Sequence, residues 1–240
     1  MPIDLQPARN TLPANPNTRS AAEAGLGQHM RAIYNYMAGA LALTGVVAYF
    51  ASASGLYPKL AATPFIWLVL LAPLAMVMFL SFRIQKMSLV TAQTTFWIYA
   101  AAMGLSLGGI FMVYTGESIS RVFFITAGTF GGMSLYGYTT KTDLTRFGSF
   151  LMMGLIGVII ASVVNMFMKS SALQFAVSVM GVLVFVGLTA YDTQKIRAMY
   201  LEADSQELGG KKVVMGALTL YLDFINLFLM LLRLFGGRRN

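Results

Sequence analysis

The stretch VVMGALTLYLDFINLFLMLLRLF, residues 213–235, decides the fold of this chain. It is long enough to cross a bilayer as a helix, because a span takes about 20 mainly apolar residues. It also carries a carboxylate, Asp223, near its centre. A charge at that depth costs roughly 2.5–3.5 kcal/mol on insertion scales, so the acid is expected to face protein or water rather than lipid. We therefore predict a helix that is buried among other helices.

Helical spacing gathers the polarity of this segment on one face. Residues that follow each other at steps of three and four lie on the same side of a helix. Those on the polar side are Gly216, Thr219, Asp223, Asn226, Met230 and Arg233. We predict that this stripe faces a cavity or partner helices, with Gly216, Thr219, Asn226 and Met230 as candidate pore-lining residues.

The composition is that of a polytopic membrane protein. Of the 240 residues 57 % are hydrophobic and 11 % charged, whereas soluble domains have about 25 % charged residues. The absence of Cys excludes disulfides and thiolate metal sites, and the single His29 leaves no room for a His-rich one. The net charge of +8 is typical of cytoplasmic loops and headgroup contacts, so we expect a lipid bilayer, and not nucleic acid, as the partner.

The pattern predicts an all-α protein of two parts. Residues 1–28 contain four prolines with Asn, Thr and Ala, which indicates a disordered N-terminal tail, and residues 29–240 form the transmembrane domain. Seven apolar segments are each near the length of a span. They are 33–53, 64–82, 94–114, 120–138, 148–168, 172–192 and 213–235, of which 120–138 is weakest because it is rich in Gly and Thr. Gly pairs four residues apart, such as Gly104/Gly108 and Gly128/Gly132, favour close packing of helices.

The basic residues predict a cytoplasmic N-terminus, because Lys and Arg are more frequent on the inner side of a membrane. With that orientation the outer set is the smaller one. It consists of Lys59, Arg121, Lys169, Arg233, Arg238 and Arg239. The C-terminal GGRRN then lies outside, if the last helix crosses fully, or inside, if it is re-entrant.

A second acid, Asp192, stands at the end of the sixth segment in LTAYDTQKI. We expect the helix to continue through Arg197, and the connection 193–212 is long enough to let Asp192 meet Asp223. Two carboxylates in contact cannot easily both be ionised and share a proton, which makes a pH switch. The pair is also a possible transient Ca²⁺ site, although two carboxylates alone bind it poorly. Alternatively, Asp192 is an exposed loop acid and Asp223 only binds Thr219, Asn226 or a neighbouring backbone group.

Arg83 ends the second segment in MVMFLSFRIQKMS, on the same side as Asp192. It is a candidate partner for Asp192, in an ion pair that protonation would release. The alternative is an anchor at the inner membrane surface.

Three motifs in order resemble the Bax inhibitor-1 (transmembrane Bax inhibitor motif) family, in its bacterial YccA-like branch. They are SLYGYTTKTDL at 134–144, FVGLTAYDTQKI at 185–196 and ALTLYLDFINLFLMLLRLFG at 217–236. The resemblance implies seven helices with the last one central, a pH sensor formed by Asp192 and Asp223, and a basic latch for which Arg83 is the best match. It also implies a location in the bacterial inner membrane and a pH-dependent calcium leak.

Three functions remain as hypotheses. The first is a pH-sensitive calcium or cation leak channel without a bound cofactor and without enzymatic activity. The second is a regulator that binds another membrane protein, such as a membrane protease. The third is an intramembrane aspartyl protease, for which Tyr191-Asp192 fits but the Gly-x-Gly-Asp motif is missing, since the second acid follows Leu220, Tyr221 and Leu222.

Overall fold

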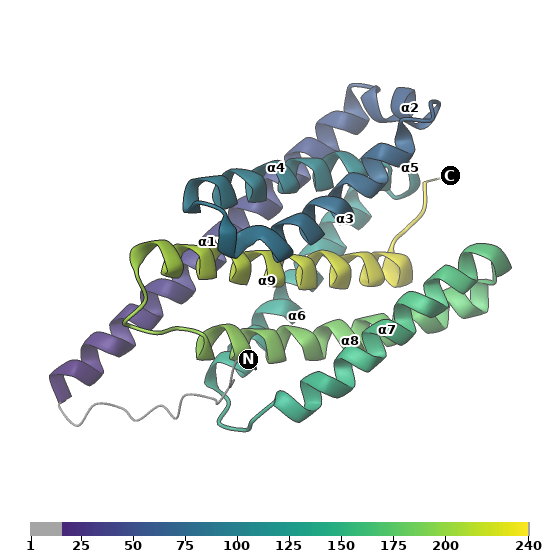
Figure 1. Cartoon of the computed structure of the whole chain (residues 1–240). Coiled ribbons are helices and arrows are strands. Elements are labelled where there is room, and N and C mark those ends of the chain that lie inside the picture. Colours follow the sequence, from purple (N-terminus) through teal and green to yellow (C-terminus); the bar gives the residue numbers. More distant parts are fainter. Residues whose placement is uncertain (1–15, 240) are drawn as a thin grey trace, which may run out of the picture.

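Helices make up almost all of residues 16–239, which are the residues that the computed structural model describes (Figure 1). Ser or Thr side chains cap several of their first turns, as in α4, α6, α8 and α9. The elements are α1 Pro16–Ala53, α2 Leu56–Ala61, α3 Ile66–Arg83, the 3-10 turn η1 Ile84–Lys86, α4 Leu89–Leu107, α5 Ile110–Val113, α6 Gly116–Thr139, α7 Thr145–Met168, α8 Ser171–Ala198 and α9 Gln206–Phe235.

The all-α prediction is confirmed. The predicted apolar segments fall largely in helices, but 64–82 begins two residues before α3 and 94–114 is interrupted at Gly108 and Gly109. Within the described residues, six helical stretches are long and apolar enough to cross a membrane, in α1, α3, α4–α5, α7, α8 and α9. Helix α6 has 24 residues but is not among them. Its Gly and Thr content, already visible in the sequence, lowers its hydropathy.

The first helix begins earlier than the predicted boundary at residue 28. Helix α1 starts at Pro16 and continues without a break to Ala53, so the prediction of a disordered tail is wrong for residues 16–28. The segment from Ala22 is already part of a stretch that meets the length and hydropathy of a span. Residues 1–15 lie outside the described residues.

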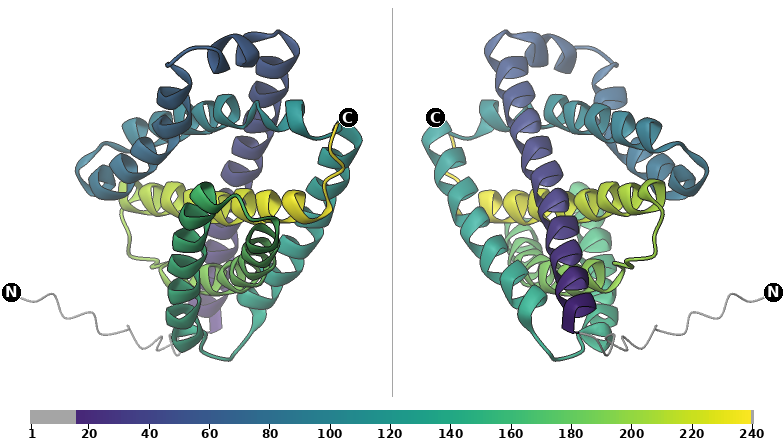
Figure 2. Two further views of the ribbon diagram at one scale, coloured as in Figure 1. Left: turned by 90° about the vertical axis from the view of Figure 1, so that its right-hand side faces the viewer. Right: turned by 90° about the vertical axis from the view of Figure 1, so that its left-hand side faces the viewer.

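Helix α9 is the most buried of the long apolar helices, as the central position predicted for it requires. In its most apolar window 67 % of the residues are buried, against 44 % for α8. It lies between α3 and α4 on one side and α7 and α8 on the other, and α1 crosses it (Figures 1 and 2). It packs against α8, α1, α6 and α4. Because neighbours surround it, α9 positions any site built on its side chains.

A buried hydroxyl ties three helices together. Thr44 Oγ1 of α1 donates to the carbonyl oxygen of Ala100 in α4 at 2.8 Å. Its single proton is then used, so Tyr221 of α9 donates its hydroxyl proton to Thr44 at 2.8 Å. Thr44 and Tyr221 are both buried, and a satisfied polar contact in this position fixes the packing of α1, α4 and α9.

Two glycines allow helix backbones to touch. A Cβ at Gly104 of α4 would lie 2.6 Å from the carbonyl oxygen of Thr44, and one at Gly137 of α6 would overlap the carbonyl oxygen of Ala190 in α8. Such contacts are the packing that glycine permits between membrane helices. The prediction is wrong for Gly128 and Gly132, because a Cβ at either would meet nothing within 4 Å.

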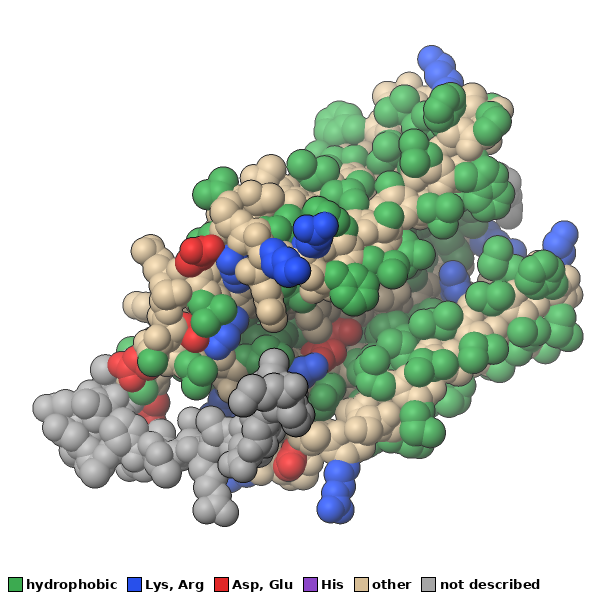
Figure 3. Space-filling view, in the orientation of Figure 1, with side chains coloured by type: hydrophobic (Ala, Val, Ile, Leu, Met, Phe, Trp, Pro, Cys, Tyr) green, Lys and Arg blue, Asp and Glu red, His purple; other side chains and the backbone are tan. Residues whose placement is uncertain are grey.

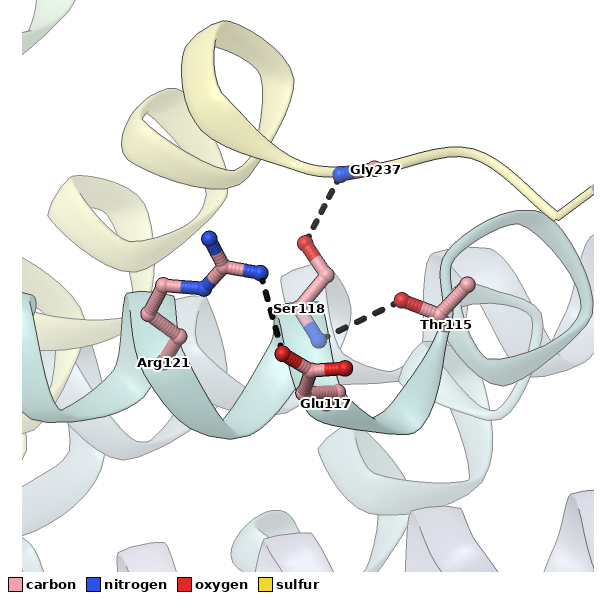
Figure 4. A network of polar contacts seen from close by, with 5 residues as sticks. All are labelled: Thr115, Glu117, Ser118, Arg121 and Gly237. Carbon is pink, nitrogen blue, oxygen red and sulfur yellow. Dashed lines mark hydrogen bonds and ion pairs between the residues drawn. The ribbon is translucent and has the colours of Figure 1, made fainter.

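The residues after α9 are bound to the start of α6 (Figure 4). Thr115 N donates to Gly237 O at 3.1 Å, and Gly237 N donates to Ser118 Oγ at 2.7 Å. Nearby, Glu117 and Arg121 form an ion pair one helical turn apart, at 3.4 Å and largely exposed. The other end of α6 is bound to α8, since Arg197 donates to Tyr138 O at 2.6 Å. Helix α6 therefore reaches from one end of the bundle to the other.

Candidate functional site

A cavity of about 820 Å³ lies between α7, α8 and α9. Most of its wall is aliphatic, but several polar side chains project into it. These are Ser162, Asn165, Gln174, Asp192, Lys195, Thr219, Asp223, Asn226 and Arg233. Figure 3 shows the corresponding hollow between α9 and the α7/α8 pair, with acidic and basic side chains inside it. A polar path between apolar helices is the arrangement in which membrane proteins place functional charge.

Asp223 is the deepest acid of this cavity. Only 5 % of the residue is exposed, and its Oδ2 receives no hydrogen bond from any group among residues 22–239. A buried carboxylate oxygen without a donor is costly. Thr219 and Asn226, which one alternative from the sequence made the partners of Asp223, donate instead to carbonyl oxygens of α9.

Asp192 lies beside it, within hydrogen-bonding range of the Asp223 carboxyl group. It belongs to α8, which continues to Ala198, and it is half-buried, so it is not an exposed loop acid. The two helices meet through a short connection, residues 199–205, rather than through the long connection 193–212 expected from the sequence. Extension of both helices sets the register that brings the two acids together.

Basic groups at the cavity have separate positions. Lys195 lies one turn after Asp192, lines the cavity and acts on that carboxyl through its charge. Arg197, two residues further along α8, packs over the Tyr138 ring at 5.1 Å. Arg233 lines the cavity further along α9, toward the C-terminus. Of these basic groups, Lys195 is the one close to the acid pair, and it lies on the same helix as Asp192.

Three of the four candidate pore-lining residues face the cavity, namely Thr219, Asn226 and Met230. Thr219 Oγ1 donates to Met215 O at 3.0 Å and Asn226 Nδ2 to Leu222 O at 2.9 Å, so both satisfy a donor within α9. The prediction is wrong for Gly216. A Cβ there would lie 2.9 Å from Ile33 of α1, because the stripe drifts around the helix and its first residue meets α1 instead of the cavity.

Arg83 is not brought to the acid pair. Its side chain is exposed at the end of α3 and takes part in none of the ion pairs found among residues 16–239. Helix α3 lies on the far side of α9 from α8 (Figures 1 and 2). The ion pair between Arg83 and Asp192 is therefore absent from the arrangement described here.

Sequence reasoning missed the contribution of α7 and of the start of α8. Ser162 and Asn165 of α7 and Gln174 of α8 line the cavity. The signal was present, because Ser162 and Asn165 are polar residues three apart in an otherwise apolar segment, and such residues usually face the interior of a bundle.

The acid pair has few further ligands for a metal ion. The described residues contain no group of three or more His, Cys, Asp or Glu side chains that are close enough together to hold one. Ca²⁺ prefers six to eight oxygen ligands, so the two carboxylates with Thr219 and Asn226 suit a passing ion better than a resident one.

Comparison with known proteins identifies the family. Residues 26–240 match the family described as Bax1-I, inhibitor of apoptosis-promoting Bax1. The chain is 51 % identical over 220 residues to the inner membrane protein YbhL of Escherichia coli (strain K12), covering 90 % of this chain and 94 % of that protein.

Other relatives come from distant bacteria. A protein of Rickettsia prowazekii (strain Madrid E) is 52 % identical over 217 residues, which cover 90 % of this chain and 92 % of the relative. A membrane protein of Streptococcus pyogenes serotype M3 is 34 % identical over 218 residues, with coverage of 90 % and 95 %. The similarity to YbhL, together with the long apolar helices, identifies an integral inner membrane protein. The chain therefore belongs to the Bax inhibitor-1 family.

Proposed function

We propose that this protein is a pH-sensitive leak channel for calcium or a similar cation, with the ion path in the cavity beside α9. The observation that carries the proposal is the contact between the Asp192 and Asp223 carboxyl groups inside a polar-lined cavity. The pair can gain or lose a proton. Its ionised carboxylate oxygens are also ligands that attract a divalent cation strongly.

The gating step follows from electrostatics. With one shared proton the pair is joined by a hydrogen bond between α8 and α9. When that proton leaves, two like charges stand at contact distance, where their repulsion is on the order of 4 kcal/mol at an effective dielectric constant of 20. That energy is enough to favour a different arrangement of α8 against α9. The two protonation states therefore differ in helix packing and in their attraction for a cation.

Arg83 acts as a latch in this proposal, in a second arrangement of the helices. Helix α3 is the least buried of the six long apolar helices and packs mainly on α4. It is thus the element that moves with the smallest loss of packing. Approach of α3 would allow Arg83 to pair with an ionised Asp192, whereas protonation of Asp192 would release it.

The proposal includes seven crossings and a cytoplasmic N-terminus. Helix α6 supplies the seventh crossing, because its first residues contact Gly237 after α9 and its last residues contact α8 near Ala190. The segments that follow α1, α4, α7 and α9 then lie at one membrane surface, together with the smaller set of basic residues. Reagents that do not cross membranes would test this. A Cys at Thr142 should react from the cytoplasmic side only, and one at Ser54 from the outside only.

Calcium flux into liposomes tests the function. Purified protein is reconstituted into vesicles that contain a calcium dye, and influx is measured between about pH 6 and about pH 8. We expect protein-dependent influx that changes with pH and is lost or made insensitive to pH in Asp223→Asn. Influx that is absent at every pH, together with co-purification of a membrane protease, would instead support the regulator.

The carboxyl contact also favours a second candidate, since aspartic proteases use two carboxylates that share a proton. The residues before Asp223 speak against it, because Leu220 and Leu222 occupy the positions of the two glycines. Incubation with a helical membrane substrate decides between the two. We expect no cleavage, whereas cleavage that is lost in Asp192→Ala would support the protease.

A further inference from the structure

A second cavity, of about 730 Å³, lies between α1 and α6 and does not include the acid pair. Aliphatic and aromatic side chains form most of its wall, with Phe224 of α9 as part of the floor. Leu135 of α6 lines the cavity and is 64 % exposed, so the cavity opens on the outer surface of the bundle, where a membrane helix meets lipid. We call this cavity the α1–α6 groove.

The length of the α1–α6 groove fits one leaflet of a bilayer. Arg31 and Leu41 of α1 both line it, and they are separated by about 15 Å along the helix axis at 1.5 Å per residue. Half of a hydrocarbon core of about 30 Å is also about 15 Å. An acyl chain that starts at the level of Arg31 would therefore extend along the groove to the middle of the bilayer.

Positive charge lies at one end of the groove only. Arg31 is exposed, and its Nε donates to Gly27 O at 3.2 Å, which leaves both terminal nitrogens without a hydrogen bond or ion pair to any of residues 22–239. Arg197 adds a second guanidinium, held over the ring of Tyr138, which also lines the groove. Arginine at the interface matches the phosphate of a lipid headgroup in charge and in geometry.

The hydroxyl groups of Tyr34 and Ser134 in the groove wall already have partners. Tyr34 is hydrogen-bonded to Ser134, and Ser134 to Thr193 of α8 at 2.9 Å. Tyr34 and Ser134 therefore do not need a polar ligand, and an apolar acyl chain can pack against this part of the wall. We infer that the α1–α6 groove binds one anionic phospholipid of the inner leaflet, with its phosphate at Arg31 and an acyl chain along Met37, Phe130 and Phe224.

Gly131 offers a way to fill the groove. It lines the groove, and a Cβ there would meet nothing within 4 Å. The next residue, Gly132, is equally open but does not line the groove, so Gly132→Leu is a matched control for Gly131→Leu. Lys86, a basic residue of η1 that does not line the groove, gives Lys86→Gln as the control for Arg31→Gln.

Native mass spectrometry of the full-length protein in detergent tests the inference, with phosphatidylglycerol and phosphatidylcholine of identical acyl chains. We expect the wild type to bind one phosphatidylglycerol about fivefold more tightly than phosphatidylcholine, as one interfacial charge contact provides. Arg31→Gln should abolish that preference, whereas Lys86→Gln should keep it. Gly131→Leu should weaken binding of both lipids, and Gly132→Leu should not.

Equal affinity for the two lipids in the wild type, or equal binding by Gly131→Leu and wild type, would overturn the inference. A dimer that dissociates in Gly131→Leu would also overturn it, because a second copy of the chain would then occupy the groove. Thermal unfolding shows whether each variant folds, and Ala38→Leu, at another exposed groove position, replaces Gly131→Leu if that variant does not. None of these outcomes depends on calcium flux, so the inference stands or falls separately from the leak.

Discussion

Asp192 of α8 and Asp223 of α9 hold their carboxyl groups within hydrogen-bonding range of each other, inside a cavity and with Asp223 almost fully buried. The two residues are well separated in the sequence. The contact exists because α8 continues past Asp192 and a short connection returns the chain as α9. The pair therefore depends on how α8 and α9 are aligned, and the gain or loss of one proton changes the interaction between the two acids.

Removal of one acid should abolish the pH dependence of calcium influx. In Asp223→Asn no second carboxylate competes for a proton, so Asp192 alone no longer forms a coupled pair. We expect wild-type influx to change by at most about tenfold per pH unit, as for one titrating proton, and the variant to give a nearly flat profile. The measurement is dye-reported influx into liposomes over the same pH range.

Asp143→Asn is the matched control for that experiment. Asp143 is an exposed acid before α7, and hydrogen bonds from Thr145 Oγ1 at 2.6 Å and Thr145 N at 2.9 Å hold the pKa of its carboxyl group below the usual value. Because the pKa is lowered on folding, its stabilising effect is present above the ordinary value and is lost only as pH falls through the lowered one. It stays ionised across the assay, so an altered pH profile in Asp143→Asn would contradict the assignment of the sensor to the buried pair.

Water should reach the cavity face of α9. The chain has no Cys, so each introduced Cys is the single thiol of its variant. Thr219→Cys and Asn226→Cys face the cavity and should react with a charged methanethiosulfonate reagent, with loss of calcium influx because the adduct blocks the path.

Ala217→Cys provides the comparison for those two variants. Ala217 is fully buried in the same helix and does not line the cavity. It should remain unmodified for as long as the protein is folded. Equal labelling at Ala217 and Asn226, or full labelling of Asn226 without any effect on influx, would rule out an ion path along this face.

The contact between α6 and α8 should not tolerate a methyl group at Gly137. A Cβ there would overlap the Ala190 carbonyl oxygen, which belongs to the backbone and cannot rotate away. We expect Gly137→Ala to lower the free energy of unfolding by about 1–3 kcal/mol, as overpacking does. Gly132→Ala, in open space on the same helix, should be neutral or stabilise by up to about 1 kcal/mol. Thermal unfolding in detergent measures both, and equal stability of the two variants would show that the helices separate easily.

The hydroxyl group of Thr44 should stabilise the fold, because it joins α1 to both α4 and α9. Thr44→Val removes the donor to Ala100 O and leaves the buried Tyr221 hydroxyl without its acceptor. We expect a loss of about 1 kcal/mol. Thr126→Val is the control, because the buried Thr126 hydroxyl donates only to Val122 O within its own helix. A loss in Thr126→Val as large as that in Thr44→Val would mean that the link between helices adds nothing.

Local patterns were sufficient for the helices and for the identity of the acids. Hydropathy over some 20 residues predicts a membrane helix because only a helix satisfies every backbone group within the span. Asp223 stands out for the same reason, since a charge so deep in residues 213–235 requires surroundings other than lipid. The motifs at 134–144, 185–196 and 217–236 were enough to recognise the family that the comparisons then showed.

Packing between helices decided the rest. Gly216 belongs to the polar stripe by spacing, yet it meets Ile33 of α1. Arg83 is the last residue of α3, and α3 lies on the far side of α9 from α8. Helical periodicity determines which residues share a face, but it says nothing about which neighbour that face meets. The rotation and register of each helix depend on side-chain contacts between segments far apart in the chain, and those contacts exist only once all the helices have assembled.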